Sequence, residues 1–251
     1  MSGVWRLIDS GMVQPAESAA LDEAILDAHI DGLVPDTLHF YVRARPTVSV
    51  GYFQKISESV SLEGCRERGV AIVRRKSGGS SIFTDSGQLI YGLVLSESDL
   101  PQDRTESFRL VCSSLARAIA SLGVEAVYRP MNDIEVSGNK VSGNAQLRRK
   151  GSVLQHGTVI LDTDLKTMDE VLRPRDSRTR GHFIPSARVS TLRALTGTVP
   201  SMEHLKRAIT SEIEATFDVK FERGTLTAEE TASVARLVQE FYSREDWNLK
   251  F

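Results

Sequence analysis

The stretch RRKSGGSSIFTD, residues 74–85, links predicted β-strands through a short turn of glycine and serine. The apolar run before it, residues 70–75, and the runs after it, residues 81–84 and 88–95, have the length and composition of strands. The strands follow one another too closely for the crossover helix that parallel neighbours require. The close spacing therefore argues against a regular series of parallel strands and favours a mixed, largely antiparallel sheet.

The rest of the chain extends this pattern on both sides. Strands are expected at residues 37–42, 47–53, 133–136, 140–146, 152–161 and 219–221, and helices at residues 18–30, 62–68, 106–122, 205–213 and 227–241. The clearest helix carries an apolar stripe of Phe108, Val111, Cys112, Leu115, Ile119 and Leu122. With no repeat and no linker, residues 1–251 are predicted to form a single α/β domain of the α+β type, a mixed, largely antiparallel sheet flanked by helices.

Composition excludes several classes of partner. Lys plus Arg number 31 and Asp plus Glu number 33, for a net charge of -2, which gives no general attraction to nucleic acid or to an anionic membrane. The first ten residues lack the apolar run of a signal peptide, and nothing later approaches the length of a membrane span. Cys65 and Cys112 match neither a disulfide framework nor a metal site. A cytoplasmic location is therefore expected.

The glycine turn itself is a candidate anion site. Backbone N–H groups of Gly78 and Gly79 can approach an anion closely, and Arg74 and Arg75 can fork onto phosphate or carboxylate oxygens. The spacing is that of neither a Walker loop nor a dinucleotide fingerprint. A plain hairpin with solvated cations is the alternative.

A second candidate is the segment NDIEVSGNKVSGNA, residues 132–145. Lys140 follows a predicted tight turn between two strands, so its ammonium can point along the sheet into a cleft and stabilise developing negative charge. A surface lysine on a hairpin is the alternative. His156 is the only histidine beside other candidate polar residues, and no cluster of metal ligands is present. A basic segment, residues 173–180, has the polarity of a loop that folds over a polyanion or simply lies in solvent.

Together these segments resemble the lipoate-protein ligase A family, in the family's order and over nearly the whole chain. Residues 74–85 resemble its RRxSGGG signature, and Asn132-Asp133 with residues 140–145 resembles its Asn-Asp and lysine motif. Residues 155–158 (QHGT) are similar to its His-Gly strand, and residues 20–24, 51–54 and 186–192 match further elements. Thr84 in place of the usual His, and Ser80-Ser81 in place of Gly-Ala, depart from the pattern.

The resemblance implies a fold related to biotin ligases and class II aminoacyl-tRNA synthetases. It also implies activation of lipoate with ATP and Mg²⁺ to lipoyl-AMP, followed by transfer to a lysine of an acceptor protein. Lys140 would bridge the nucleotide and the lipoyl carboxyl as the catalytic residue. The implied nucleotide contacts are Arg75, Ser80, Ser81, Ile82 and Phe83. The implied pocket residues are Gly78, Gly79, Asn132, Asp133 and His156, with Asp133 a candidate ligand for Mg²⁺.

Partners follow from the same resemblance. The acceptor is expected to be an E2 lipoyl domain, an H-type carrier of glycine cleavage or another lipoate-binding protein. The chain ends near Trp247-Asn248, where the family's large domain ends, so the small C-terminal domain is expected to be absent. A separate accessory subunit is then expected to assist adenylation.

Two other functions are weighed against the ligase. Octanoyltransferases of this fold pass the acyl group through a cysteine thioester, whereas the corresponding places here hold Met131 and residues 152–155. A non-catalytic subunit that binds a lipoyl group or a nucleotide would not need both Lys140 and Arg75. The sequence analysis therefore predicts the ATP-dependent ligase as the main function and an octanoyl or lipoyl transferase as the alternative.

Overall fold

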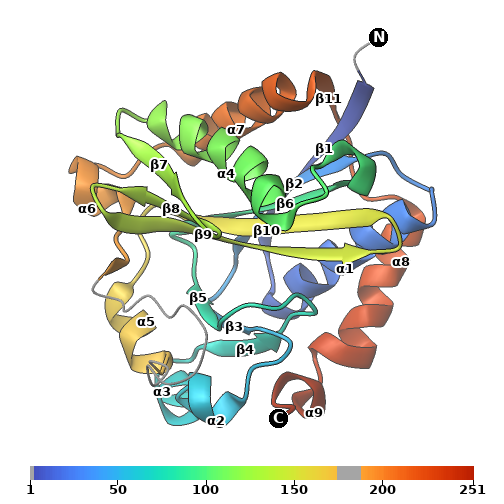
Figure 1. The fold of residues 1–251 in the computed structure, drawn as a ribbon. Coiled ribbons are helices and arrows are strands. Elements are labelled where there is room, and N and C mark those ends of the chain that lie inside the picture. The colour runs from blue at the N-terminus through green and yellow to red at the C-terminus, as the bar shows by residue number, and fades with distance from the viewer. Residues whose placement is uncertain (1–2, 174–187) are drawn as a thin grey trace.

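The computed structural model describes residues 3–173 and 188–251 and contains one large and one small β-sheet (Figure 1). The large sheet has the strand order β11-β1-β2-β6-β10-β9-β8-β7. Its strands are β1 (Gly3–Val13), β2 (Thr37–Arg43), β6 (Gln88–Ser96), β7 (Ala126–Arg129), β8 (Asp133–Val136), β9 (Asn139–Arg149), β10 (Ser152–Ile160) and β11 (Val219–Arg223). β1 runs parallel to β2 and to β11, and the other neighbours are antiparallel, as predicted.

The small sheet has the order β4-β3-β5 and carries the glycine turn between two of its strands. Its strands are β3 (Thr47–Val50), β4 (Ala71–Arg74) and β5 (Ile82–Thr84). Short helices surround it: α2 (Ile56–Ser59), α3 (Leu62–Glu67) and α5 (Leu165–Val171). Val48, Val50 and Phe83 pack with residues of these helices in a separate apolar cluster.

Helices cover both faces of the large sheet (Figure 1). On one face lie α4 (Arg104–Ala120) and α7 (Met202–Phe217), whose buried residues join the main apolar core. On the other face lies α1 (Pro15–Ile30), which also contacts α8 (Ala228–Leu237) and strand β4 of the small sheet. The remaining elements are η1 (Glu97–Asp99), α6 (Leu192–Thr196), η3 (Val238–Tyr242) and α9 (Glu245–Asn248).

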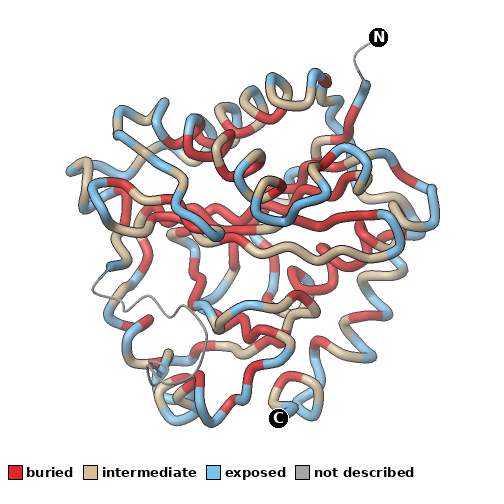
Figure 2. Tube along the Cα trace, viewed as in Figure 1, coloured by how far each residue is buried: buried red, intermediate tan, exposed pale blue. Residues whose placement is uncertain are grey.

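Helix α1 is buried on nearly all sides, as the red tube between the two sheets shows (Figure 2). Its apolar residues Leu21, Ala24 and Ile25 pack as predicted, but Asp22 and Glu23 are buried as well. A buried carboxylate is costly unless it has polar partners. The position of α1 therefore requires a polar network beside it, and that network forms the site described below.

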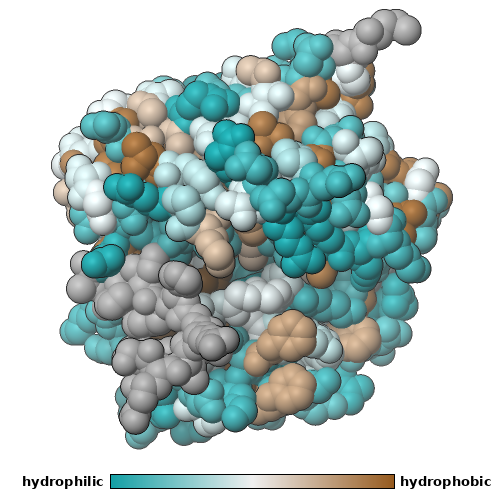
Figure 3. All heavy atoms as spheres, in the orientation of Figure 1, coloured by the Kyte–Doolittle hydropathy of each residue, from teal (hydrophilic) through white to brown (hydrophobic). Residues whose placement is uncertain are grey.

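Two strands were missed in the sequence. β1 was not expected because its sequence shows no regular alternation of apolar and polar residues. In the structure its pairing with β2 shifts register between Asp9 and Met12. β7 is a four-residue edge strand with no buried residue, so it lacks an apolar run. Across the described parts of the chain, no helix is both long and apolar enough to cross a membrane. Most residues on the face in view are hydrophilic, with apolar residues scattered among them (Figure 3).

Candidate active site

A cavity of about 660 Å³ lies against the face of the large sheet that α1 covers. The glycine turn, α1, β2, β6, β9, β10 and α5 all contribute to its wall. Among the predicted site residues, those that line it are Arg75, Gly79, Ser80, Ser81, Ile82, Phe83, Asn132, Asp133, Lys140 and His156. Gly78 is not part of the wall. The structure thus brings together segments that lie far apart in the sequence, although their chemical roles stay predictions.

The wall of this cavity combines an apolar part with a polar part. Leu26, Ile90 and Leu154 belong to the packed interior between α1 and the large sheet and also face the cavity. Asp22, Arg43 and His156 line it from the same elements. An apolar wall with a few convergent polar groups is typical of a site for a small organic group.

Arg74 and Arg75 hold the glycine turn in place. The buried Arg74 donates to the backbone carbonyls of Gly51, Tyr52 and Gln54, at 2.8 to 3.1 Å, and to that of Lys250. Arg75 donates to the backbone carbonyl of Ser49 at 2.7 Å and to those of Gly78 and Ser80 at 2.8 Å. Both guanidinium groups therefore donate hydrogen bonds to backbone carbonyls in this structure, and these bonds hold the glycine turn in its shape.

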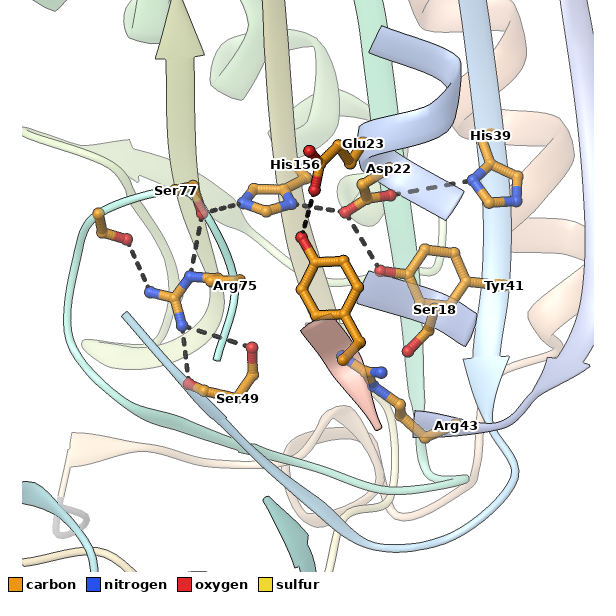
Figure 4. Close-up of polar contacts among 12 residues, drawn as sticks. Ser18, Asp22, Glu23, His39, Tyr41, Arg43, Ser49, Arg75, Ser77 and His156 are labelled. Carbon is orange, nitrogen blue, oxygen red and sulfur yellow. Dashed lines mark hydrogen bonds and ion pairs between the residues drawn. The ribbon is translucent and has the colours of Figure 1, made fainter. Parts of the chain in front are cut away.

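The turn presents Ser77 to the half-buried His156, which in turn contacts the buried carboxylate of Asp22 (Figure 4). His156 Nε2 lies 2.8 Å from Ser77 Oγ, and His156 Nδ1 lies 2.7 Å from Asp22 Oδ2. The Nε nitrogen of Arg75 also donates to Ser77 Oγ, at 3.0 Å. Ser77 is 2% exposed, yet it lines the cavity together with His156 and Asp22.

Lys140 lies on the same face of the sheet as this group. Its Nζ is 2.6 Å from Asp133 Oδ1, and a Cβ added to Gly143 would meet that Nζ at 2.8 Å. Ala145 lies two residues after Gly143 on β9 and is paired directly with His156 of β10. Residues two apart on a strand share a face, so Lys140 and His156 line the same side of the cavity. Gly143 leaves the room in which the ammonium lies.

Asn132 is engaged with backbone. Its side-chain amide donates to the carbonyl of Asn144, and Asn144 Nδ2 donates to the carbonyl of Asn132 at 2.9 Å. Asn144 Oδ1 accepts from the Tyr91 hydroxyl at 2.7 Å. This reciprocal pair fixes the segment that leads into β8 and so positions Asp133.

The predicted Mg²⁺ role of Asp133 stays a prediction. In this structure the carboxylate of Asp133 is paired with Lys140 at 2.6 Å. Within residues 3–173 and 188–251, no group of three or more His, Cys, Asp or Glu side chains is placed to hold a metal ion.

Neither cysteine reaches the cavity. Cys112 is completely buried on α4, and Gln155 Nε2 approaches its Sγ at 3.6 Å. Gln155 and His156 are consecutive on β10 and so point to opposite faces, which places the sheet between Cys112 and the cavity. Burial raises the pKa of Cys112 to about 12 and that of Cys65 to about 11. Cys65 packs in the apolar cluster of the small sheet.

Asp22, Ser77 and Arg43 are cavity residues that the sequence did not single out. Asp22 and Ser77 lie inside matched motifs, but their types and spacing carry no signal of contact, because 134 positions separate Asp22 from His156 and 79 separate Ser77 from it. Of the basic segment at residues 173–180, residues 174–180 lie outside the described residues, as do Ser186 and Ala187. Arg188 lines the cavity from the next described segment.

Whole-chain relatives correct the predicted activity. Octanoyltransferase LipM of Geobacillus kaustophilus is 33% identical over 274 residues, covering 98% of both chains. Octanoyltransferase LipM of Halalkalibacterium halodurans is 33% identical over 98% of this chain and 99% of its own. The predicted ATP-dependent lipoate-protein ligase is therefore wrong, and the alternative, an octanoyl or lipoyl transferase, is supported. The prediction failed because the absence of a thiol from the motifs was taken to favour adenylation over acyl transfer.

Solved structures confirm the predicted fold. Lipoate-protein ligase A bound with ATP is 27% identical, with a TM-score of 0.85 over 99% of both chains. A bi-partite lipoate protein ligase from Thermoplasma acidophilum, described with its E2 lipoyl domain, is 27% identical, with a TM-score of 0.83 over 99% of this chain and 96% of its own.

The predicted family is confirmed by a match that spans most of the chain. The model of the lipoyl protein ligase A/B catalytic domain matches residues 14–214, which include α1, the glycine turn and every strand that lines the cavity. This chain belongs to the lipoyl protein ligase A/B catalytic-domain family.

Proposed function

We propose that this protein transfers an octanoyl group from an activated thioester to the lysine amine of a lipoyl-domain acceptor. The observation that carries the proposal is 33% identity to octanoyltransferases named LipM along nearly the whole length of both chains. The cavity supports it, because an apolar wall beside His156 and Lys140 suits a fatty acyl chain that ends in a reactive carbonyl.

Within this proposal, Lys140 supplies positive charge where the carbonyl oxygen becomes negative. A fixed donor or cation aimed at such an oxygen stabilises the transition state more than the ground state. The ion pair with Asp133, at 2.6 Å, and the open space above Gly143 fix the position of the ammonium. The remaining predicted cavity residues shape the turn and the wall around it.

The acceptor is proposed from the same likeness. One structural neighbour is a ligase described with its E2 lipoyl domain, and this fits an E2 lipoyl domain as the partner. The H-type carrier and other lipoate-binding proteins remain predicted alternatives. An acyl group already activated as a thioester needs no ATP, so ATP, Mg²⁺, lipoyl-AMP and an accessory subunit have no step in this transfer.

A transfer assay tests the proposal. The purified protein is mixed with an octanoyl thioester and an isolated lipoyl domain, and the mass of the domain is followed. We expect octanoylation without ATP, confined to the acceptor lysine and lost in a domain with that lysine replaced by Ala. An unmodified domain after long incubation, under conditions in which a LipM octanoyltransferase modifies it fully, would refute octanoyl transfer to this acceptor.

The two cysteines provide a second test. A double Cys65→Ala, Cys112→Ala variant should transfer octanoyl within a few-fold of the wild type, because neither thiol faces the cavity. Burial also keeps both thiols protonated, since their pKa values are raised to about 11 and about 12. The comparison is made on variants whose thermal unfolding is measured first, because emptying buried sites lowers stability. Loss of transfer in a folded double variant would contradict the absence of a thioester step.

A further inference from the structure

Three cavity residues are joined by hydrogen bonds in the arrangement that activates a serine. Ser77 Oγ lies 2.8 Å from His156 Nε2, and Asp22 Oδ2 lies 2.7 Å from His156 Nδ1 (Figure 4). We propose that Ser77 is the acyl-accepting nucleophile of this protein, with His156 as its general base and Asp22 as the residue that orients His156. This inference rests on the proposed acyl transfer and replaces a cysteine thioester with a serine oxyester.

The arrangement has the roles of a serine triad in the required order. In such a triad the carboxylate accepts from Nδ1–H, so Nε2 is left without a proton and can take one from the serine hydroxyl. The three residues come from α1, the glycine turn and β10, so each is positioned by a different element. The same constellation arises on unrelated folds, and roles rather than sequence order define it.

Asp22 is held in place by its surroundings. The Tyr41 hydroxyl donates to Asp22 Oδ2 at 3.3 Å, and a Cβ on Gly92 would approach Asp22 Oδ1 to 3.1 Å. His39 Nδ1 lies 3.9 Å from Asp22 Oδ1, and burial lowers the pKa of His39 to about 4, so this second histidine is neutral. His156 is therefore the histidine on which Asp22 acts through a direct hydrogen bond.

Arg75 completes the environment of the serine oxygen. Its Nε donates to Ser77 Oγ at 3.0 Å, so a cation lies beside the oxygen that must lose its proton. Burial lowers the pKa of Arg75 to about 10, which leaves the guanidinium charged at neutral pH. A nearby cation favours the anionic form of a hydroxyl, as it does for other acids.

A second serine, histidine and aspartate group shows why location matters. His29 Nδ1 lies 2.8 Å from Ser152 Oγ, and His29 Nε2 lies 2.7 Å from Asp36 Oδ1. None of these three residues lines the cavity, and they connect the end of α1 to the start of β10 and to the residue before β2. Hydrogen bonds alone therefore do not mark a nucleophile. The Ser77 group differs because an acyl-sized cavity meets it.

The chemical steps balance without a further reagent. Ser77 Oγ attacks the thioester carbonyl carbon while its proton passes to His156 Nε2, and the negative charge collects on the carbonyl oxygen. The carbon–sulfur bond then breaks, and the leaving thiolate takes the proton from Nε2. In the second half, the acceptor lysine amine attacks the oxyester and gives a proton to Nε2. The carbon–oxygen bond breaks, and Ser77 Oγ recovers that proton.

The acyl-enzyme is sought directly, without the acceptor. The full-length protein is incubated with octanoyl-N-acetylcysteamine, quenched in acid and examined by intact-mass and peptide mass spectrometry. We expect one octanoyl group on the peptide that contains Ser77. As an oxyester it should survive neutral hydroxylamine and be released at alkaline pH, whereas a thioester is released at neutral pH. An adduct on a cysteine, or on a serine other than Ser77, would overturn the assignment.

Variants separate a nucleophile from a structural anchor. Ser77→Ala should form no adduct and should lower transfer by about 10³-fold or more, as removal of a triad member does. Ser77→Cys should form an adduct that neutral hydroxylamine releases, a change that an anchoring role would not produce. Ser152→Ala is the matched control, because it removes the serine of the second group, and it should keep both the adduct and the transfer.

The outcomes distinguish this inference from the proposed function. Wild-type transfer with no adduct, together with near-normal transfer by folded Ser77→Ala, would overturn the serine while leaving octanoyl transfer intact. An adduct on Ser77 without transfer to the lipoyl domain would support the serine and refute that acceptor. Neither adduct nor transfer would overturn both.

Discussion

Replacing Asp22 by Asn is expected to lower octanoyl transfer by about 10⁴-fold while the protein stays folded. The amide would turn an N–H toward His156 Nδ1, which now lies 2.7 Å from a carboxylate oxygen. Nδ1 would then act as an acceptor and Nε2 would carry the proton, so Nε2 could no longer take one from Ser77. In serine triads the same change of tautomer has an effect of about this size.

The matched control is Asp36→Asn. Asp36 Oδ1 accepts from His29 Nε2 at 2.7 Å and from the Ser96 backbone N–H at 3.0 Å, and Asp36 lies outside the cavity, so this variant makes the same change from carboxylate to amide beside a histidine. It should transfer octanoyl within a few-fold of the wild type. Steady-state rates and thermal unfolding are measured for both variants. Equal activity of folded Asp22→Asn and Asp36→Asn would show that Asp22 does not orient a catalytic histidine.

The Asp22 contact explains why the sequence predicted the fold more completely than the site. Helix α1 follows from its apolar residues Leu21, Ala24 and Ile25, of which Leu21 and Ile25 pack with residues of the large sheet, whereas Ala24 packs with α8 and η3. These apolar residues do not predict burial of the opposite face, because that depends on α8 and the small sheet, which arrive from distant parts of the chain. Asp22 faces the large sheet, where its partners Tyr41, Gly92 and His156 come from three strands that lie far along the chain, so its burial and its contacts could not be predicted either.

For the glycine turn, too, the sequence predicted the local structure but not the contacts of its side chains. Its position between strands could be predicted from composition, because glycine and serine follow an apolar run. The hydrogen-bond partners of Arg74 and Arg75 could not be predicted. Both side chains donate to backbone carbonyls whose positions only the folded chain defines. Adjacent cations predict an anion site only where their donors remain free.

The error in the predicted reaction has a physical cause. Cys112 was correctly placed in the apolar stripe of a helix, and it is buried on the face of the sheet away from the cavity. Absence of a thiol from the motifs was then taken to favour adenylation over transfer. Whether another oxygen or sulfur can act as the nucleophile depends on its neighbours in space, and Ser77 meets His156 only in the folded protein.

Lys140→Ala is expected to lower the turnover rate of octanoyl transfer by about 10²–10³-fold, with a small effect on the binding of the thioester. The ammonium is held on the cavity wall by Asp133 Oδ1 at 2.6 Å and shares a face of the sheet with His156. Its proposed charge stabilisation applies mainly when the carbonyl oxygen becomes negative, so its removal should act on the transition state. Lys140→Arg keeps the charge and should retain more activity than Lys140→Ala.

Lys206→Ala is the matched control for this lysine. Lys206 Nζ lies 2.6 Å from Asp9 Oδ2, and its side chain is 13% exposed against 22% for Lys140. It lies on α7, on the other face of the large sheet, so its loss removes a comparable ion pair without touching the cavity. Initial rates of transfer, measured over a range of thioester concentrations, separate the turnover rate from the binding of the thioester. If folded Lys140→Ala turned over as fast as Lys206→Ala, the ammonium would have no part in the reaction, and the charge on the carbonyl oxygen would have to be met by other donors on the cavity wall.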